Sequence, residues 1–365
     1  MPTLLASPRG HAMNEGFQKV RVAAAQISPA FLDREGSTEI ACHWIAEAAR
    51  GGAELLSFGE AWLPAYPFWI FMGSPIYSAQ FSRRLYENAV EIPSATTDRL
   101  CEAARKAGIH VVMGLTELWG GSLYLAQLFI NDRGEIVGHR RKLKPTHWER
   151  AIWGEGDGSD FFVVPTSIGR LGALNCWEHL QPLNLFAMNA FGEQIHVAAW
   201  PAFAIYNRVD PSFTNEANLA ASRAYAMATQ TFVIHTSAVV DDATVELLCD
   251  DDDKRLLLES GGGQCAVINP LGAIISTPLS STAQGLVFAD CDFGVIASAK
   301  MSNDPAGHYQ RGDVFQVHFN PAPRRPLVPR AAIAADPTTA ASEDLPNIKH
   351  PPFSPAVKLP IVVDD

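Results

Sequence analysis

The sequence has no long apolar run. Nowhere in its 365 residues does it approach the ~18 consecutive apolar residues that a membrane-spanning helix needs. Residues 1–16 (MPTLLASPRGHAMNEG) also have no apolar core of the kind found in secretion signals. We therefore expect no membrane partner, a cytoplasmic location, and a disordered N-terminal extension over residues 1–16.

Clustered positive charge is scarce as well. The formal net charge is -11 at pH 7, and the only basic clusters are short, at residues 140–142 and 324–325. Binding of nucleic acid relies on Lys and Arg side chains that neutralise phosphates, so we expect no nucleic-acid partner. The glycine-rich stretch ESGGGQC (259–265) matches neither the G-x-x-x-x-G-K-[ST] nor the G-x-G-x-x-G pattern. No nucleotide or other cofactor is expected.

Cysteine is sparse and unpaired in the sequence. The six cysteines form no C-x-x-C pair and are too few for a disulfide scaffold in a chain of this length. We expect most of them to be buried thiols in a reducing compartment. The string CWEH (176–179) contains a C-x-x-H spacing, but no second ligand pair with zinc spacing follows it. We therefore expect no metal.

Strand and helix patterns alternate along the chain, in which 47% of residues are hydrophobic. In the first half the patterns predict strands at 19–28, 53–63 and 109–118, helices at 37–52, 78–90 and 96–108, and a hairpin at 123–141. In the second half they predict strands at 169–176, 195–200, 231–240 and 285–292, helices at 183–194 and 215–230, and a hairpin at 264–276. A capping box at Ser37 or Thr38 is expected to begin the helix at 37–52.

The two hairpins occupy matching places in the two halves. This predicts an internally duplicated α/β structure, with helices outside mixed rather than purely parallel sheets. We expect one domain over residues 17–320. Residues 321–365 hold ten of the 25 prolines and show weak periodicity, so we expect a proline-rich C-terminal tail that could serve as an oligomerisation arm.

Three reactive side chains stand where predicted strands end: Glu60, Lys142 and Cys176. A thiol is a useful nucleophile only as the thiolate, and a carboxylate in an apolar pocket is a strong enough base to take its proton. A lysine beside both can stabilise negative charge that develops on the substrate. Such a set suits attack on a carbon that bears nitrogen, with a covalent intermediate that water later releases.

Two alternatives use the same cysteine. Histidine is the commonest activating base for a thiol, so Cys176 could pair with His179, His196 or His235. However, a rigid i,i+3 placement rarely lets an imidazole reach back to the thiol. The C-x-x-H string could instead be half of a metal site, but its second half is missing.

Three segments in this order resemble the motifs of the nitrilase superfamily, over residues from about 20 to about 320. FGEAWLPAYP, HRRKLKPTHWER and LNCWEHLQPL look like its glutamate, lysine and cysteine motifs. The resemblance implies Glu60 as general base, Lys142 as electrostatic and proton-handling partner, and Cys176 as nucleophile. It also implies that Glu149 positions Lys142. The family usually has Pro before the catalytic Glu; here Gly59 stands there, which predicts a less tightly fixed Glu60.

The resemblance also implies an architecture and a reaction. Similar proteins are four-layer α-β-β-α sandwiches of two mixed sheets with internal pseudo-symmetry, and they form homodimers that assemble into larger oligomers, spirals or filaments. True nitrilases convert an organic nitrile and water into the carboxylic acid and ammonia through a cysteine thioimidate and thioester. Five aromatic residues near the motifs could form substrate-binding walls: Trp62, Tyr66, Trp153, Trp177 and Trp200.

These aromatic residues favour an aryl- or arylaceto-nitrile as the substrate. The alternatives within the superfamily are an aliphatic nitrilase, a cyanide-hydrating enzyme and an amidase with the same triad. A different class of protein, a non-catalytic scaffold that forms filaments, would not need to keep Glu60, Lys142 and Cys176 together.

Overall fold

The computed structural model describes residues 16–209 and 214–324. Nearly all of the predicted extension (1–16) and most of the predicted tail (321–365) lie outside the described residues. The first of two sheets holds, in spatial order, β11 (Gly285–Asp292), β1 (Lys19–Gln26), β2 (Leu55–Ser57), β3 (His110–Trp119), β4 (Ser122–Ile130) and β5 (Ile136–Arg141). The second holds β10 (Ala266–Ile268), β9 (Phe232–Ser237), β8 (Ile195–Trp200), β7 (Gly169–Asn175) and β6 (Val164–Thr166).

Both sheets are mixed and repeat one plan. Strands β1, β2 and β3 are parallel neighbours in the first sheet, as β7, β8 and β9 are in the second. Antiparallel strands flank each parallel set. The predicted internal duplication and mixed pairing are confirmed.

Alternate residues of β1 face two different layers of the core. Val20, Val22 and Ala24 pack between the two sheets, in one cluster with residues of β7, β8 and β9. Ala23 and Ala25 face the other way, toward helices α1 (Arg34–Arg50) and α3 (Ala95–Ala107). Because side chains alternate between the faces of a strand, a strand of small apolar residues suits burial on both faces.

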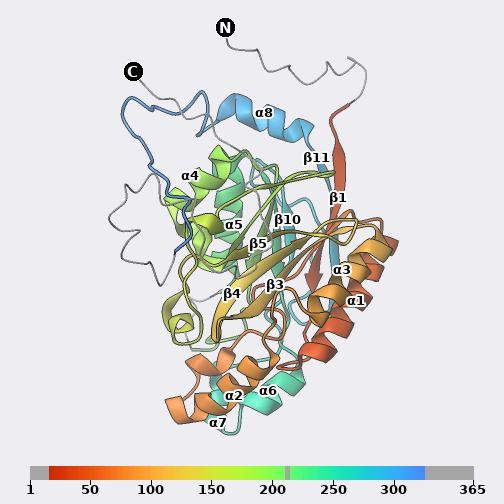
Figure 1. Ribbon diagram of the computed structural model, residues 1–365, viewed down its shortest axis with the longest axis vertical. Coiled ribbons are helices and arrows are strands. Elements are labelled where there is room, and N and C mark those ends of the chain that lie inside the picture. Colours follow the sequence, from red (N-terminus) through yellow and green to blue (C-terminus); the bar gives the residue numbers. More distant parts are fainter. Residues whose placement is uncertain (1–15, 210–213, 325–365) are drawn as a thin grey trace, which may run out of the picture.

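A third cluster lies under α4 (Pro182–Ala190) and α5 (Asn215–Thr229) on the outer face of the second sheet. Figure 1 shows α1 and α3 on one side of the molecule and α4 and α5 on the other, with the strands between them. The layers therefore run helix, sheet, sheet, helix. This confirms the predicted four-layer α-β-β-α sandwich.

The remaining helices cover the ends of the sandwich. Helices α2 (Pro75–Asn88), α6 (Asp242–Leu248) and α7 (Asp252–Leu257) gather at one end, and α8 (Gly294–Ser302) lies at the other (Figure 1). Four short 3-10 helices complete the described structure: η1 (Phe68–Phe71), η2 (His147–Ala151), η3 (Gly158–Asp160) and η4 (Cys176–Leu180). None of the helices in the described ranges is long and apolar enough to cross a membrane.

Three local predictions were wrong. The strand predicted over 53–63 ends at Ser57, because the chain then turns toward the second sheet through Ala61, whose φ is 46°. Helix α1 begins at Arg34 rather than near Ser37, because Asp33 caps it by accepting the Gly36 N–H. The second hairpin keeps its turn after Ile268, but beyond the turn only an isolated bridge to Ile274 forms.

Candidate active site

Four of the predicted site residues meet at one place between the sheets. Glu60 lies in the turn after β2, Lys142 directly follows β5, Glu149 lies in η2, and Cys176 opens η4 after β7. Ligand atoms of Glu60, Glu149 and Cys176 all lie within 4.8 Å of one another. Each of the four residues is at most 3% exposed. The sandwich thus brings residues far apart in the sequence into one buried site.

The Lys142 ammonium lies between two carboxylates. Its Nζ donates to Glu60 Oε1 at 2.8 Å and to Glu149 Oε2 at 2.7 Å. Glu149 is held in turn by the Tyr66 hydroxyl, which donates to Oε1 at 2.8 Å, and by the Thr146 N–H, which donates to Oε2 at 2.7 Å. Glu149 therefore has fixed partners and positions Lys142, whereas Glu60 keeps one oxygen, Oε2, that has no hydrogen-bond partner among the described residues.

Burial and neighbouring charge shift the pKa values of the site. Burial raises the pKa of Glu60 to about 8; Lys142 opposes this and Glu149 adds to it. Burial would lower the pKa of Lys142, but the Glu149 and Glu60 carboxylates outweigh it and raise that pKa. Burial and Glu60 raise the pKa of the Cys176 thiol well above its usual value, while Lys142 and the Trp177 backbone N–H oppose them.

These shifts determine where the protons reside. One ammonium cannot balance two carboxylates and a thiolate, so the Glu60 carboxyl and the Cys176 thiol both have raised pKa values and are not ionised together. Once Glu60 is ionised, its Oε2, which has no partner among the described residues, is the atom open to a proton. The arrangement is that of a buried thiol with its own base and a fixed cation beside it.

Cys176 has an unusual backbone conformation. Cys176 has a φ of 49°, in the left-handed region that residues with a Cβ rarely adopt and that costs about 1–2 kcal/mol. The turn around it is fixed by the buried Glu178 carboxylate, which accepts the Asn175 N–H and the Leu143 N–H, each at 2.8 Å. Glu178 also forms a bidentate pair with Arg140 of β5, at 2.9 and 2.8 Å. Strain of this kind persists only where surrounding contacts hold it.

The histidines do not contact the thiol through their ring nitrogens. His179 Nδ1 is 2.6 Å from the Cys176 backbone O, and its Nε2 is 2.9 Å from Nε2 of His196. His235 pairs instead with Ser222, its Nδ1 lying 2.8 Å from the hydroxyl oxygen. Both ring nitrogens of His179 and of His196 have hydrogen-bond partners, whereas Glu60 has an oxygen without a partner among the described residues.

Two carboxylate oxygens, from Glu60 and Glu149, and the Cys176 sulfur are close enough to one another to act together as ligands of a cation. The Lys142 ammonium already lies within hydrogen-bond distance of both carboxylates. The positive charge that these acids require is therefore supplied by the chain itself. His179 has partners on both ring nitrogens, so Cys176 and His179 do not act as a ligand pair.

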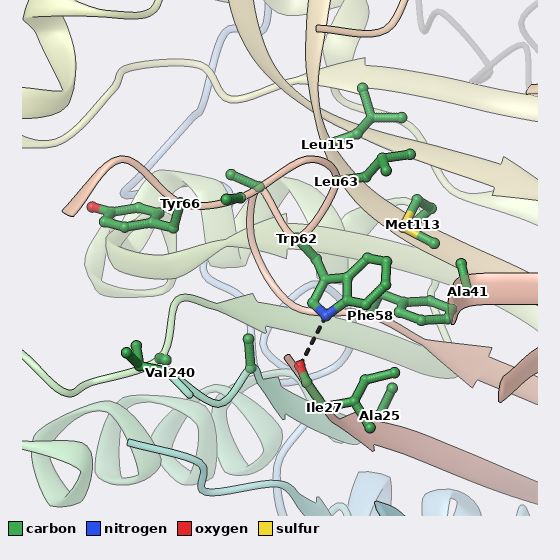
Figure 2. Close-up of a cluster of buried hydrophobic side chains, with 14 of the residues drawn as sticks. Ala25, Ile27, Ala41, Phe58, Trp62, Leu63, Tyr66, Met113, Leu115 and Val240 are labelled. Carbon is green, nitrogen blue, oxygen red and sulfur yellow. Dashed lines mark hydrogen bonds between the residues drawn. The ribbon is translucent and has the colours of Figure 1, made fainter. Parts of the chain in front are cut away.

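Two of the predicted aromatic residues border a small cavity beside Glu60. Trp62 and Tyr66 line this cavity of ≈ 20 Å³, together with apolar residues that include Phe31 and Phe68. Figure 2 shows the Trp62 indole, whose N–H donates to the Ile27 carbonyl at 2.9 Å, next to Phe58. A cavity of this volume holds about one water molecule. A larger group enters only if the walls move apart.

The other three aromatic residues lie around the same site at different depths. The buried Trp153 packs against Tyr66, with ring centroids 5.9 Å apart. Trp200 is fully buried, stacks on His179 at 5.4 Å and donates to the Ser222 hydroxyl at 3.0 Å. Trp177 is 39% exposed, so its side chain lies on the surface, although its backbone N–H lowers the pKa of the Cys176 thiol.

Gly59 does not leave Glu60 loose. A Cβ at position 59 would lie 2.9 Å from the Trp200 carbonyl O and 3.1 Å from the Ala238 N. The next N–H, that of Glu60, donates to the same Trp200 carbonyl at 3.0 Å. The close approach of two backbones therefore fixes the turn, and the weak orientation expected from a glycine at position 59 is not what the structure shows.

Sequence reasoning missed the residues that hold the nucleophile's turn. Arg140 and Glu178 are 1% and 4% exposed, and neither was singled out as functional. The available signal was their place within the motifs: Arg140 sits two residues before Lys142 and Glu178 two residues after Cys176. Charged side chains are almost never fully buried unless they are paired, so an Arg and a Glu beside buried reactive residues indicate such a pair.

Comparison with known proteins agrees with this geometry. The carbon-nitrogen hydrolase family matches residues 21–301. An aliphatic nitrilase of Rhodococcus rhodochrous is 44% identical over 309 residues, covering 84% of each chain. An arylacetonitrilase of Aspergillus niger is 40% identical over 300 residues, covering 81% of this chain and 88% of the relative.

Solved structures resemble the fold at lower identity. A carbon-nitrogen hydrolase from Helicobacter pylori superposes with a TM-score of 0.64 at 17% identity, covering 81% of this chain and 97% of its own. Nit3 of Saccharomyces cerevisiae, a member of the nitrilase superfamily, superposes with a TM-score of 0.62 at 18% identity, covering 80% and 97%. With a family match over most of its length and relatives at these identities, the chain belongs to the carbon-nitrogen hydrolase family.

Proposed function

We propose that the protein is a nitrilase, which hydrolyses an organic nitrile to the carboxylic acid and ammonia. The observation that carries the proposal is the buried thiol of Cys176 beside a carboxylate with a free oxygen and a fixed ammonium. Relatives named as nitrilases, at 36% identity and above over most of the chain, support the substrate class.

The first half of the proposed reaction forms a covalent adduct. Glu60 takes the thiol proton, and the Cys176 sulfur attacks the nitrile carbon to form a thioimidate. The nitrile nitrogen becomes negative as its bond order falls. The Lys142 ammonium and the Trp177 backbone N–H stabilise that charge, and the proton from the thiol passes through Glu60 to the nitrogen.

The second half uses two waters. Glu60 removes a proton from the first water as it adds to the thioimidate carbon, and the tetrahedral intermediate expels ammonia to leave a thioester. A second water, activated by the same carboxylate, releases the carboxylic acid and returns the thiol. If the tetrahedral intermediate expels sulfur instead, the product is an amide. Glu149 and Tyr66 keep Lys142 in place throughout.

We propose an aryl- or arylaceto-nitrile as the preferred substrate. The cavity beside Glu60 is walled by Phe31, Trp62, Tyr66 and Phe68, and aromatic rings gain from contact with other rings. Trp153 packs against Tyr66, Trp177 directly follows Cys176, and Trp200 stacks on His179; these three are proposed as further contacts. The relatives include aliphatic nitrilases and arylacetonitrilases, so short aliphatic nitriles are the competing class.

We also propose one catalytic domain over residues 17–320, a cytoplasmic location, and a homodimer that assembles into larger oligomers. Free thiols at all six cysteines support a reducing compartment. Exposed apolar side chains beside the site, including Leu180 and Leu183, support self-association. Light scattering after size-exclusion chromatography tests the assembly: a monomer at working concentration would contradict it.

Ammonia release from a defined panel tests the function. Phenylacetonitrile, benzonitrile, a short aliphatic nitrile, cyanide and the matching amides are incubated with the wild type and with Cys176→Ala, and the organic products are identified. The proposal expects acid and ammonia from nitriles, fastest with the aryl or arylaceto compounds, and no product from Cys176→Ala. Turnover of amides alone, or of nothing in the panel, would overturn it.

A further inference from the structure

A chain of buried polar groups runs from the backbone of the nucleophile into the protein interior. The Cys176 carbonyl O lies 2.6 Å from His179 Nδ1, and His179 Nε2 lies 2.9 Å from His196 Nε2. His196 Nδ1 lies 2.8 Å from Glu193 Oε2, and the Tyr225 hydroxyl donates to Glu193 Oε1. All of these side chains are at most 3% exposed. The reaction proposed above uses none of them.

The chemistry of the atoms fixes where each proton lies. A carbonyl oxygen only accepts, so His179 Nδ1 carries a hydrogen and, in a neutral ring, its Nε2 accepts. His196 Nε2 must then donate, which leaves its Nδ1 as an acceptor. Glu193 must therefore donate from Oε2. The chain is complete only while one proton is held between Glu193 and His196.

The surroundings favour that neutral form. Burial raises the pKa of Glu193 to about 8, although the Tyr225 hydroxyl opposes it. Burial also lowers the pKa of His196 well below its usual value and that of His179 to about 3.

The charged and titratable groups that face the chain come from four elements: Arg140 of β5, Glu178 of η4, Tyr225 of α5 and His235 of β9. Arg140 and Glu178 pair with each other. On the side of β7, Glu193 meets Gly172, which has no titratable side chain.

Loss of the Glu193 proton breaks this chain of hydrogen bonds. The ionised carboxylate requires a hydrogen on His196 Nδ1, so the neutral ring presents a lone pair at Nε2. Either two lone pairs then face each other between the imidazoles, or His179 also changes tautomer and turns a lone pair toward the Cys176 carbonyl. Both outcomes remove a hydrogen bond from the chain and weaken its hold on the nucleophile's backbone.

The carbonyl at the end of the chain belongs to the peptide group that stabilises the thiolate. The Cys176 C=O and the Trp177 N–H are parts of one peptide unit, and that N–H lowers the pKa of the Cys176 thiol. A hydrogen bond accepted at a carbonyl polarises its peptide and strengthens donation from the N–H. The chain therefore acts on the thiolate and also helps to hold the positive φ of Cys176.

We propose that Glu193, His196 and His179 are positioning residues whose proton series holds and polarises the Cys176–Trp177 peptide, so that loss of the Glu193 proton at alkaline pH weakens the nucleophile. The inference rests on the proposed function only in taking Cys176 as the nucleophile. The proposal makes the reactivity of Cys176 depend on the protonation of Glu193, in addition to its dependence on Glu60, Lys142 and Glu149.

Glu193→Gln separates the two protonation states. Its amide donates to His196 and its oxygen accepts from Tyr225, so the chain is kept but cannot ionise. The rate of Cys176 alkylation by iodoacetamide, located by mass spectrometry, is compared with the wild type from about pH 6 to about pH 10, a range that spans ordinary His and Tyr pKa values. Titration of Glu60 and Cys176 is common to both proteins and cancels in the ratio.

The wild-type rate divided by the Glu193→Gln rate is expected to be constant at low pH. It should then fall, with a midpoint at about 8, by about threefold to tenfold, the effect of losing one hydrogen bond. Glu193→Leu cannot donate at all and is expected to be about tenfold slower than Glu193→Gln at low pH. A ratio for Glu193→Gln that stays constant across the range would overturn the proposal.

His235→Gln is the matched control. It replaces a fully buried histidine of the neighbouring strand that pairs with Ser222 rather than with the chain, and its ratio to the wild type is expected to stay flat with pH. A pH-dependent fall as large as that of Glu193→Gln would also overturn the proposal. Alkylation needs no nitrile turnover, so a failure of the nitrilase proposal would appear in the product panel and leave this test intact.

Discussion

Lys142 is the one cation among the four central groups of the candidate site, and its charge sets the proton balance there. It contacts Glu60 and Glu149, which leaves the group one positive charge short once both acids are ionised. Burial is the main cause of the raised pKa of Glu60, and the negative charge of Glu149 adds to it despite the ammonium. In the proposed reaction, a Glu60 with this raised pKa holds the proton that it takes from the thiol until the nitrile nitrogen accepts it.

The activity should depend on the protonation of Glu60. Below its pKa of about 8 the carboxyl is protonated and cannot act as a base, so kcat/KM for a nitrile should rise as pH increases through that value. Measurement in Glu193→Gln, which lacks the alkaline fall inferred above, isolates this rise. A kcat/KM that is independent of pH from about pH 6 to about pH 9 would contradict the assignment of Glu60 as base.

The same shift has a consequence for stability. A carboxyl whose pKa is higher in the folded than in the unfolded protein stabilises the fold in its protonated form. For Glu60 the folded value is about 8 and the ordinary value 4.5. Its contribution is therefore fully present below pH 4.5 and is lost as pH rises through about 8, so the site works in the range where it costs the fold stability.

At the scale of elements, one buried ion pair joins the two sheets. Arg140 comes from β5 and Glu178 from η4, which follows β7 of the other sheet. The same carboxylate accepts the N–H of Asn175, which precedes Cys176, and the N–H of Leu143, which follows Lys142. The pair therefore links the packing of the sandwich to the backbone of Cys176.

Arg140→Met should destabilise the protein by about 3–5 kcal/mol, because it leaves the Glu178 carboxylate buried without its cation. Urea unfolding monitored by circular dichroism measures the loss. The double variant Arg140→Met with Glu178→Met should be more stable than Arg140→Met alone, since both buried charges are gone. It should stay poorly active, however, because the Asn175 and Leu143 N–H groups lose their acceptor. A single variant as stable as the wild type would refute this account.

The sequence was informative about the reactive residues and the order of elements, and less so about turns. Glu60, Lys142 and Cys176 were singled out because each stands where a predicted strand ends, within a recognisable motif. The strand through Glu60 was predicted too long because apolar residues continue past Ser57 to Leu63, and local pattern cannot show that this run bends into the other sheet. The cap of α1 was misplaced by a few residues because Asp33 and Ser37 are both good capping residues.

The buried hydrogen bonds that connect Cys176 to Glu193 could not be predicted from the sequence. Glu193 and His196 are 17 and 20 positions from Cys176, and Tyr225 lies on a different helix. Nothing in their spacing indicates that they share hydrogen bonds. The contacts exist only because β8 pairs with β7 in parallel and α5 covers the same face.

At the scale of the whole molecule, the duplicated sandwich explains how so polar a site can be buried. Glu60 and Lys142 follow strands of the first sheet, and Cys176 follows a strand of the second. The Glu60 N–H donates to the Trp200 carbonyl across the interface between the sheets. Packing of the sheets therefore completes the site, and neither half of the duplication contains it alone.

The central claim is that Cys176 forms a covalent adduct during nitrile turnover. We would quench the wild type with acid while it hydrolyses phenylacetonitrile and map the peptides by mass spectrometry, with Cys176→Ala as the control. The account predicts the mass of the phenylacetyl thioester on the peptide that contains Cys176, and no adduct in the control. Steady production of acid with an adduct on another residue, or with undiminished activity in Cys176→Ala, would contradict it.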